Sequence, residues 1–159
     1  MKILLPVDDS DSSRHALRAL TAHIRAEGAE VRVLNVVEQI SGYISADLIP
    51  HRVSYVAEIE RERRQQAERT VNLTVETLRK AGFRATGDVV EGDPKSEILD
   101  VAAKWGADLI VIGSHGWKGL NRFLLGSVSE AVARHAECSV EIVRSPQPEK
   151  RAKPRRSQR

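Results

Sequence analysis

The chain has 159 residues, of which 41% are hydrophobic and 4% aromatic, and its formal net charge at pH 7 is +3. This length suits one domain whose core is built from aliphatic side chains. A single cysteine, Cys138, excludes an internal disulfide and a cysteine metal cluster, and no apolar run is long enough to cross a membrane. We therefore expect a soluble, cytoplasmic protein, because a reducing compartment suits a chain without disulfides.

The positive charge is concentrated at the C-terminus. Residues 145–159 contain six Lys or Arg side chains and one Glu, a net charge of +5, so residues 1–144 together carry a net charge of −2. The Pro and charge content of this segment predicts a disordered basic tail after a folded domain over residues 1–144. The tail has no aromatic residue that could stack on bases, so we expect at most nonspecific contact with nucleic acid or another polyanion.

Short apolar segments alternate along the chain with amphipathic segments, a pattern that predicts parallel strands joined by helices. The first strand is predicted over residues 2–7 and the second over residues 30–37. Between them, a helix is predicted from about residue 10 to residue 27. Asp11 or Ser10 would cap its start, and Gly28 would end it.

An irregular loop is expected over residues 38–51, followed by a long helix over about 53–81 whose charged middle is typical of a solvated surface. The third strand, over residues 85–91, is comparatively polar. Asp93 and Pro94 then predict the start of a helix that runs to Trp105, as N-cap and first-turn residue. The fourth strand is predicted over 108–113, the last helix over 128–136 and the fifth strand over 139–144.

The most informative segment is GSHGWKGLNRFLLGSVS, residues 113–129, which follows the buried fourth strand. Its glycines, at positions 113, 116, 119 and 126, allow the backbone to come close to a ligand. The next helix begins near Gly126 and Ser127, where free backbone N–H groups and the helix dipole favour an anion. The segment therefore predicts a phosphate-binding loop.

The polarity of the strands predicts their order in the sheet. Strands one and four are the least interrupted by polar residues and suit the centre, whereas strands three and five suit the edges. The order 3-2-1-4-5 satisfies this, giving a single doubly wound α/β domain with a five-stranded parallel sheet and helices on both faces. In such a sheet the strands are added in one direction from strand one and then in the opposite direction from strand four. Ligands bind at this switch point, at the carboxyl ends of strands one and four. Residues 6–10 and 113–116 leave that point and are predicted to line one pocket.

Three segments resemble the universal stress protein family: PVDDSDSSRHAL near the start, EGDPKSEIL before the fourth strand, and GSHG followed by nine residues and GSVSEAVARHAECSVEIVR. The resemblance covers residues 1–144 in the right order. Gly113, Gly116, Gly126 and Ser127 fit the pattern G-x2-G-x9-G-[ST], which resembles the motif of the ATP-binding branch. Prolines commonly flank the cysteine in this family, and Glu137 and Ser139 stand there instead. The resemblance does not extend to the basic tail.

The resemblance implies ATP as the bound cofactor and assigns roles to individual positions. Asp8 would lie near the ribose or adenine, and Val36 would offer backbone polar groups to the adenine edge. The remaining positions fall into an adenine wall (Pro6, Val7), a sugar contact (Ile112, Gly113) and a phosphate shell (His115, Gly116, Gly126, Ser127, Val128, Ser129). The family also implies a homodimer through the fifth strand, whose apolar residues at an exposed sheet edge invite pairing with another chain.

Several positions allow a second interpretation. Asp8 and Asp9 form an acidic pair that could help phosphates and water to hold Mg²⁺, with Asp8 as the metal ligand, while Asp9 is better explained as a helix cap. Ser127 and Ser129 could bind phosphate or cap their helix, and His115 could contact phosphate or lie exposed in the loop. Cys138 is expected to be a small buried side chain rather than a redox group.

Missing motifs constrain the chemistry. The sequence has no GxxxxGK[ST] loop, no GxGxxG after the first strand and no evident catalytic constellation. We therefore expect a regulatory ATP-binding protein of the stress response, with slow or absent hydrolysis. One alternative is a Mg²⁺-dependent ATPase or nucleotidyl-transfer enzyme that uses Asp8 and His115. Another is a nucleotide-free adaptor that acts through its edge strand.

Overall fold

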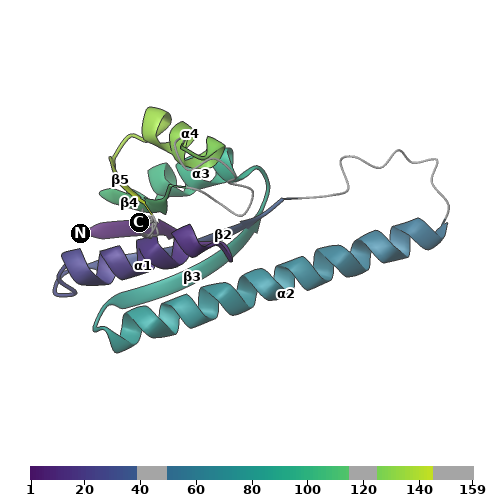
Figure 1. Ribbon diagram of the computed structural model, residues 1–159, viewed down its shortest axis with the longest axis horizontal. Helices are drawn as coiled ribbons and strands as arrows, with labels where there is room; N and C mark the ends of the chain where they lie inside the picture. Colours follow the sequence, from purple (N-terminus) through teal and green to yellow (C-terminus); the bar gives the residue numbers. More distant parts are fainter. Residues whose placement is uncertain (39–49, 115–124, 145–159) are drawn as a thin grey trace, which may run out of the picture.

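The computed structural model describes residues 1–38, 50–114 and 125–144, with the backbone alone for residues 50–55. Strands and helices alternate along the chain, as the sequence predicts (Figure 1). Their bounds are β1 (Lys2–Pro6), α1 (Asp11–His23), β2 (Glu30–Val37), α2 (Pro50–Lys80), β3 (Arg84–Glu91), α3 (Pro94–Trp105), β4 (Leu109–Gly113), α4 (Ser127–His135) and β5 (Ser139–Val143).

The five strands form one parallel sheet in the order β3-β2-β1-β4-β5. This confirms the predicted doubly wound α/β fold and its strand order. Leu4 at the centre of β1 lies beside Arg32 of β2 and Ile110 of β4. The more polar strands, β3 and β5, lie at the two edges, where fewer of their side chains must be buried.

Helices cover both faces of the sheet, because successive strand residues point to opposite sides. On one face, Ile3 and Leu5 of β1 pack with residues of α1 and α2. On the other face, Leu4 and its neighbours on β2 and β4 pack against α3 and α4 (Figure 1). The first of these cores contains buried residues from α1 (Ala16, Leu20) and α2 (Val71, Val75, Leu78), and the second contains buried residues from α3 (Ile98, Ala102) and α4 (Val132).

Helix α1 ends earlier than predicted. Its C-cap is Ile24, which has an extended backbone, and Gly28 lies beyond the helix with φ +72°. The amide of Ala29 donates to the carbonyl of Ala26, so Gly28 sits in the turn that leads into β2. Gly28 therefore provides the left-handed conformation of this turn rather than the end of the helix.

Helix α2 is longer than its contact with the sheet. Among the described side chains of α2, Ala67 is the first that is buried, residues 61–66 are exposed, and the first part of the helix extends beyond the sheet (Figure 1). Further along, α2 lies very close to β3. A Cβ built on Gly87 would be only 2.3 Å from Cγ1 of Val71. Gly87 is therefore needed for this close approach of the helix to the sheet.

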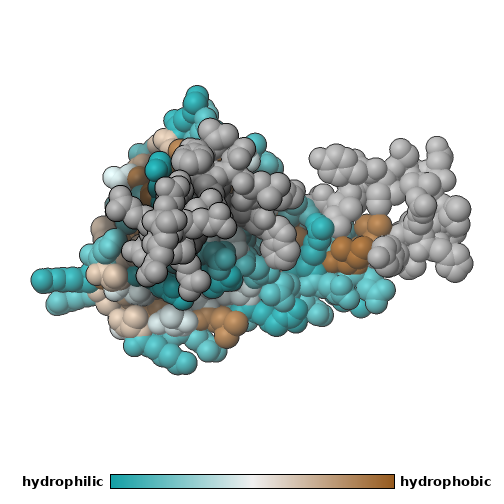
Figure 2. All heavy atoms as spheres, in the orientation of Figure 1, coloured by the Kyte–Doolittle hydropathy of each residue, from teal (hydrophilic) through white to brown (hydrophobic). Residues whose placement is uncertain are grey.

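Most of the described surface visible in Figure 2 is hydrophilic. Among the described residues, the large hydrophobic side chains that are exposed are Met1 and Leu73. Within the same residues, no helix combines the length and the apolar character needed to cross a membrane.

Candidate functional site

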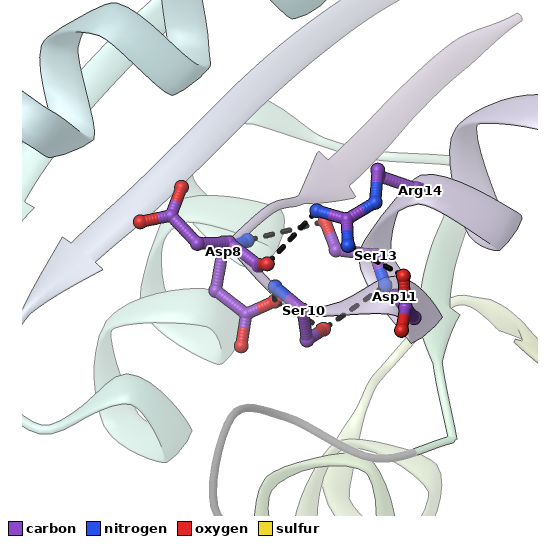
Figure 3. Close-up of polar contacts among 6 residues, drawn as sticks. Asp8, Ser10, Asp11, Ser13 and Arg14 are labelled. Atoms are coloured by element: carbon purple, nitrogen blue, oxygen red, sulfur yellow. Dashed lines mark hydrogen bonds and ion pairs between the residues drawn. The ribbon is translucent and has the colours of Figure 1, made fainter.

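The turn between β1 and α1 is held by hydrogen bonds among its own residues (Figure 3). Ser10 caps α1, because its hydroxyl oxygen accepts a 3.1 Å hydrogen bond from the amide of Ser13. The carboxylate of Asp8 accepts from both the amide (3.1 Å) and the hydroxyl (2.5 Å) of Ser10. The amide of Asp8 in turn donates to the hydroxyl of Ser13. Asp8 is thus fixed at the carboxyl end of β1, where the sequence placed it.

Asp9 has a different role from the one expected. It does not cap α1, and its carboxylate instead accepts a 2.5 Å hydrogen bond from the hydroxyl of Thr70 in α2. Its carbonyl oxygen accepts a 3.0 Å hydrogen bond from the guanidinium of Arg14. Ser10 is better suited to the cap, because its hydroxyl lies three residues before the amide that it bonds. Asp9 therefore links the first turn to a helix that follows much later in the chain.

The carboxyl end of β4 lies against the start of α1. A Cβ built on Gly113 would be 2.7 Å from the carbonyl carbon and oxygen of Ser12. Those are backbone atoms, so a larger residue could not be accommodated by a side-chain movement. Gly113 is thus required by packing, because it lets the end of β4 come close to the start of α1.

Hydrogen bonds to Ser114 join the end of β4 to the start of α4. The carbonyl oxygen of Ser114 accepts from the amide of Gly126 (2.8 Å) and from the hydroxyl of Ser129 (3.0 Å). The Ser129 side chain is buried, and its hydroxyl also lies 2.9 Å from the carbonyl oxygen of Gly126. The Ser129 hydroxyl therefore joins the start of α4 to the residue that follows β4. His115 and Gly116, predicted to contact phosphate, lie outside the described residues.

The N-terminus of α4 differs from those of α1 and α3. Side chains cap α1 and α3, through Ser10 and Asp93, whereas the N-cap residue of α4 is Gly126 and no side chain among the described residues caps this helix. The first backbone bond within α4 is donated by the amide of Glu130 to Gly126. The amides of residues 127–129 precede that bond and lie at the positive end of the helix dipole. Such an end suits an anion.

Backbone alternation orients the polar groups of Val36. The amide of Val7 donates to the carbonyl of Leu34, which therefore faces β1, while the carbonyl of Val37 accepts from Gly92 on the side of β3. The N–H and C=O groups of successive residues in a parallel strand alternate between its two neighbours. Those of Val36 consequently face the β1 side at a level where β1 has already ended. This agrees with the predicted contact between the Val36 backbone and a ligand.

The other predicted positions at the ends of β1 and β4 are buried. Val7 packs into the core beneath α1 and α2, and Ile112 packs into the core beneath α3 and α4. Pro6 is buried at the end of β1. Asn35, which the sequence analysis did not single out, is also buried and donates from its side-chain amide to the carbonyl oxygen of Val7 (2.8 Å). A polar residue inside an apolar strand was a visible signal of this role.

The described part of the site offers few side chains for metal chemistry. Among the residues that the structure describes, no three His, Cys, Asp or Glu side chains gather closely enough to hold a metal ion. Asp8 could contribute one carboxylate to Mg²⁺, and phosphates and water would have to supply the remaining ligands.

Two groups outside the site have shifted acidity. The guanidinium of Arg14 bonds Asp11 and lowers the pKa of that carboxyl group. Partial burial raises the pKa of the Cys138 thiol, whose side chain packs beside the core under α3 and α4. A raised pKa leaves less thiolate, which agrees with the expectation that Cys138 is not a redox group.

Comparison with known proteins agrees with this geometry. The profile of the Universal stress protein family matches residues 1–144. Universal stress protein MJ0531 of Methanocaldococcus jannaschii is 35% identical over 150 residues, which cover 93% of this chain and 84% of that protein. The solved structure of the hypothetical protein MJ0577 superposes with a TM-score of 0.78 at 28% identity, covering 92% of this chain and 97% of that chain.

A third similar protein was solved with a ligand. It is the universal stress protein from Archaeoglobus fulgidus in complex with dAMP, with a TM-score of 0.64 and 25% identity, covering 90% of this chain and 97% of that one. The family profile and the relative from M. jannaschii both span most of the chain. The chain therefore belongs to the universal stress protein family.

Proposed function

We propose that this protein binds ATP at the carboxyl ends of β1 and β4 and acts as a regulatory protein of the stress response. The observation that carries the proposal is the N-terminus of α4, which no side chain of the described residues caps and which lies directly after the predicted glycine loop and beside the end of β4. The similar A. fulgidus protein in complex with dAMP supports an adenine nucleotide as the ligand. The G-x2-G-x9-G-[ST] pattern supports ATP.

The proposed pose follows from the placement of the polar groups. The adenine would lie between Val36 and the wall formed by Pro6 and Val7, and its edge would bond the Val36 backbone. The ribose would lie near Asp8 and Gly113. The phosphates would extend toward the amides of residues 127–129 and the glycine loop, where Mg²⁺ could join them through Asp8.

We further propose that hydrolysis is slow or absent. The Asp8 carboxylate, which stands at the carboxyl end of β1, accepts two hydrogen bonds from Ser10 and serves the turn. General base catalysis needs a group within hydrogen-bond reach of the attacking water, and the Oδ1 atom of Asp8 is already occupied by both Ser10 donors. Binding without rapid turnover suits a regulatory protein whose nucleotide-bound form is recognised by a partner protein.

Two further features belong to this proposal. The exposed edge of β5, with Val140 and Ile142, would pair with a second copy to give a homodimer. The location of the protein in the cytoplasm remains a prediction from its single cysteine. A monomeric mass by light scattering at micromolar concentration would contradict the dimer.

Calorimetric titration with ATP, ADP and AMP, with and without Mg²⁺, tests the binding proposal. Failure of the wild-type protein to bind any of them would overturn it. A turnover assay on the same sample tests hydrolysis, and a rapid rate that rises with Mg²⁺ and collapses in Asp8→Ala would favour the enzyme instead. Identification of any nucleotide released on denaturing the purified protein would distinguish ATP from related ligands.

A pair of substitutions at Ser127 tests the proposed phosphate contact. Proline is favoured at the first position of a helix, and Gly126, with φ −64° and ψ 150°, already has the extended conformation required before proline. Ser127→Pro therefore removes one backbone N–H while keeping α4 intact, and we expect about tenfold weaker ATP binding. Ser127→Ala keeps that N–H and should bind within about threefold of wild type. Equal affinity for Ser127→Pro and wild type would contradict phosphate binding at this amide.

A further inference from the structure

Helix α2 forms two polar contacts near the carboxyl ends of the strands. The hydroxyl of Thr70 donates a 2.5 Å hydrogen bond to Asp9, 61 residues earlier in the chain. The guanidinium of Arg64 lies 2.7 Å from the carboxylate of Glu91 at the end of β3. The Arg64 and Glu91 side chains are largely solvent-accessible, so this ion pair contributes little. The contact between Thr70 and Asp9 is partly buried and joins α2 to the proposed nucleotide site.

The position of Thr70 is fixed by its neighbours on α2. The next residue, Val71, is buried against β3, where the absence of a side chain at Gly87 lets the helix come close. Thr74, one turn later, is buried and donates from its hydroxyl to the carbonyl of Thr70 (2.8 Å). The hydroxyl of Thr70 is therefore presented to Asp9 by a well-packed part of the helix.

Asp9 transmits this contact to the ligand-binding turn. It directly follows Asp8, and its carbonyl oxygen is bonded by Arg14 of α1 while its carboxylate is bonded by Thr70 of α2. Asp9, which lies between Asp8 and Ser10, is thus restrained by hydrogen bonds from two different helices. Loss of the Thr70 bond would leave a carboxylate without that partner and free one side of the turn.

From this arrangement we infer that Thr70 is a positioning residue that couples helix α2 to nucleotide binding. This inference rests on the proposed function, since it concerns the same site. Thr70 restrains Asp9, Asp9 restrains the turn that contains Asp8, and the restrained turn binds the nucleotide without a further ordering cost. The coupling is reciprocal, so a nucleotide that requires the ordered turn must also hold α2 more firmly against the body.

The exposed stretch of α2 that precedes Thr70 is where the effect of this coupling would be felt. Residues 61–66 are exposed and precede the anchor at Thr70 by about one to two and a half turns. A change in how firmly the helix is held at Thr70 changes the mobility of these residues, because they belong to the same continuous helix. The occupied and empty states of the site then differ at a surface that does not touch the nucleotide.

The test compares Thr70→Val with Thr70→Ser and Thr77→Val. Valine matches threonine in shape but cannot donate, and serine keeps the donor. Thr77 is a matched control, because its hydroxyl bonds the carbonyl of Leu73 within the same helix (2.8 Å) and, among the described residues, bonds no other element. Two readouts are used: amide hydrogen exchange of residues 8–13 without nucleotide, and the dissociation constant for ATP by calorimetry.

We expect Thr70→Val to exchange about tenfold faster over residues 8–13 and to bind ATP about tenfold more weakly. Thr70→Ser and Thr77→Val should resemble wild type in both measurements. Unchanged exchange in Thr70→Val, or faster exchange with unchanged ATP affinity, would overturn the coupling. If wild type binds no nucleotide but Thr70→Val still exchanges faster, the restraint of the turn by α2 is supported and the proposed function fails by itself.

Discussion

The side-chain amide of Asn35 in β2 donates a 2.8 Å hydrogen bond to the carbonyl oxygen of Val7, the first residue after β1. The amide of Val7 also donates to Leu34, so both polar groups of its backbone are bonded by β2. These bonds hold the chain beside β2 at the point where it leaves the sheet. They fix the geometry of the switch point from within the core.

Asn35→Ala should lower the free energy of unfolding by about 1–3 kcal/mol, because the carbonyl of Val7 would remain buried without this donor. Urea unfolding at pH 7 measures the loss. A change within a few tenths of a kcal/mol would show that water replaces the lost donor.

Asn35→Asp should be destabilised in a pH-dependent way. An ionised carboxylate cannot donate to the Val7 carbonyl, whereas a protonated one can, so folding would raise the pKa of the introduced carboxyl group. A raised folded-state pKa means that the deficit is smallest below the unfolded value of about 3.9 and grows as the pH rises through the folded value. Unfolding curves for this variant and wild type between pH 4 and pH 8 test the sign. A pH-independent deficit would contradict it.

Gly87→Ala should be destabilising by about 1–3 kcal/mol, because the added methyl group would be 2.3 Å from Cγ1 of Val71. In a Val71→Ala background that atom is absent, so the same substitution should cost clearly less. A double-mutant cycle measured by urea unfolding gives the coupling between the two sites. Additive effects would show that the helix moves away from β3 at little cost.

Asp11→Asn should lower stability slightly at neutral pH, because Arg14 lowers the pKa of this carboxyl group in the folded state. A lowered folded-state pKa stabilises the protein above the unfolded value of about 3.9, and the effect disappears as the pH falls through the folded value. Both side chains are exposed, so the difference should also shrink at high salt. Thermal unfolding at pH 7 and pH 3, in low and high salt, provides the measurement.

Cys138 should react slowly with iodoacetamide at pH 7.5, because partial burial raises the pKa of its thiol and the thiolate is the reactive form. The alkylation rate should continue to rise at pH values where an unperturbed cysteine has already ionised. Mass spectrometry of the single modified site follows the reaction, and the urea-unfolded protein is the control. Equal rates in folded and unfolded protein would contradict the shift.

Removal of residues 145–159 should leave both the unfolding free energy and the ATP affinity unchanged, since the predicted domain ends at residue 144. The shortened protein should lose retention on an anionic column, because the removed segment carries a net charge of +5. A large loss of stability would mean that the basic segment packs on the domain.

The sequence was sufficient to predict the strand order and most element bounds, because apolar strands and amphipathic segments differ in period over many residues. β2 was predicted with its observed limits, and Asp93 and Pro94 marked the start of α3 correctly. Local cap chemistry also allowed Ser10 as the N-cap of α1. Each of these signals is contained within a few neighbouring residues.

Hydrogen-bond partners that lie far apart in the sequence could not be predicted from such local patterns. The bond between Thr70 and Asp9 joins residues 61 positions apart, and no local pattern distinguishes Thr70 from Thr77. Asp9 was therefore assigned to a local cap, the partner that nearby residues could offer. The close approach of α2 at Gly87 could have been predicted, since glycine inside a strand often marks a close approach of another element.

The central place of β1 also governs the order in which the protein can assemble during synthesis. β1 can pair with β2 soon after residue 37 is made, but its other edge waits for β4, since 106 residues separate Lys2 from Asp108. Until then, one edge of this largely apolar strand has no neighbour in the sheet, and contacts that bridge such long sequence separations form slowly. A chain that ends before β4 therefore lacks the carboxyl ends of β1 and β4 side by side, and the proposed nucleotide site forms only once the domain is nearly finished.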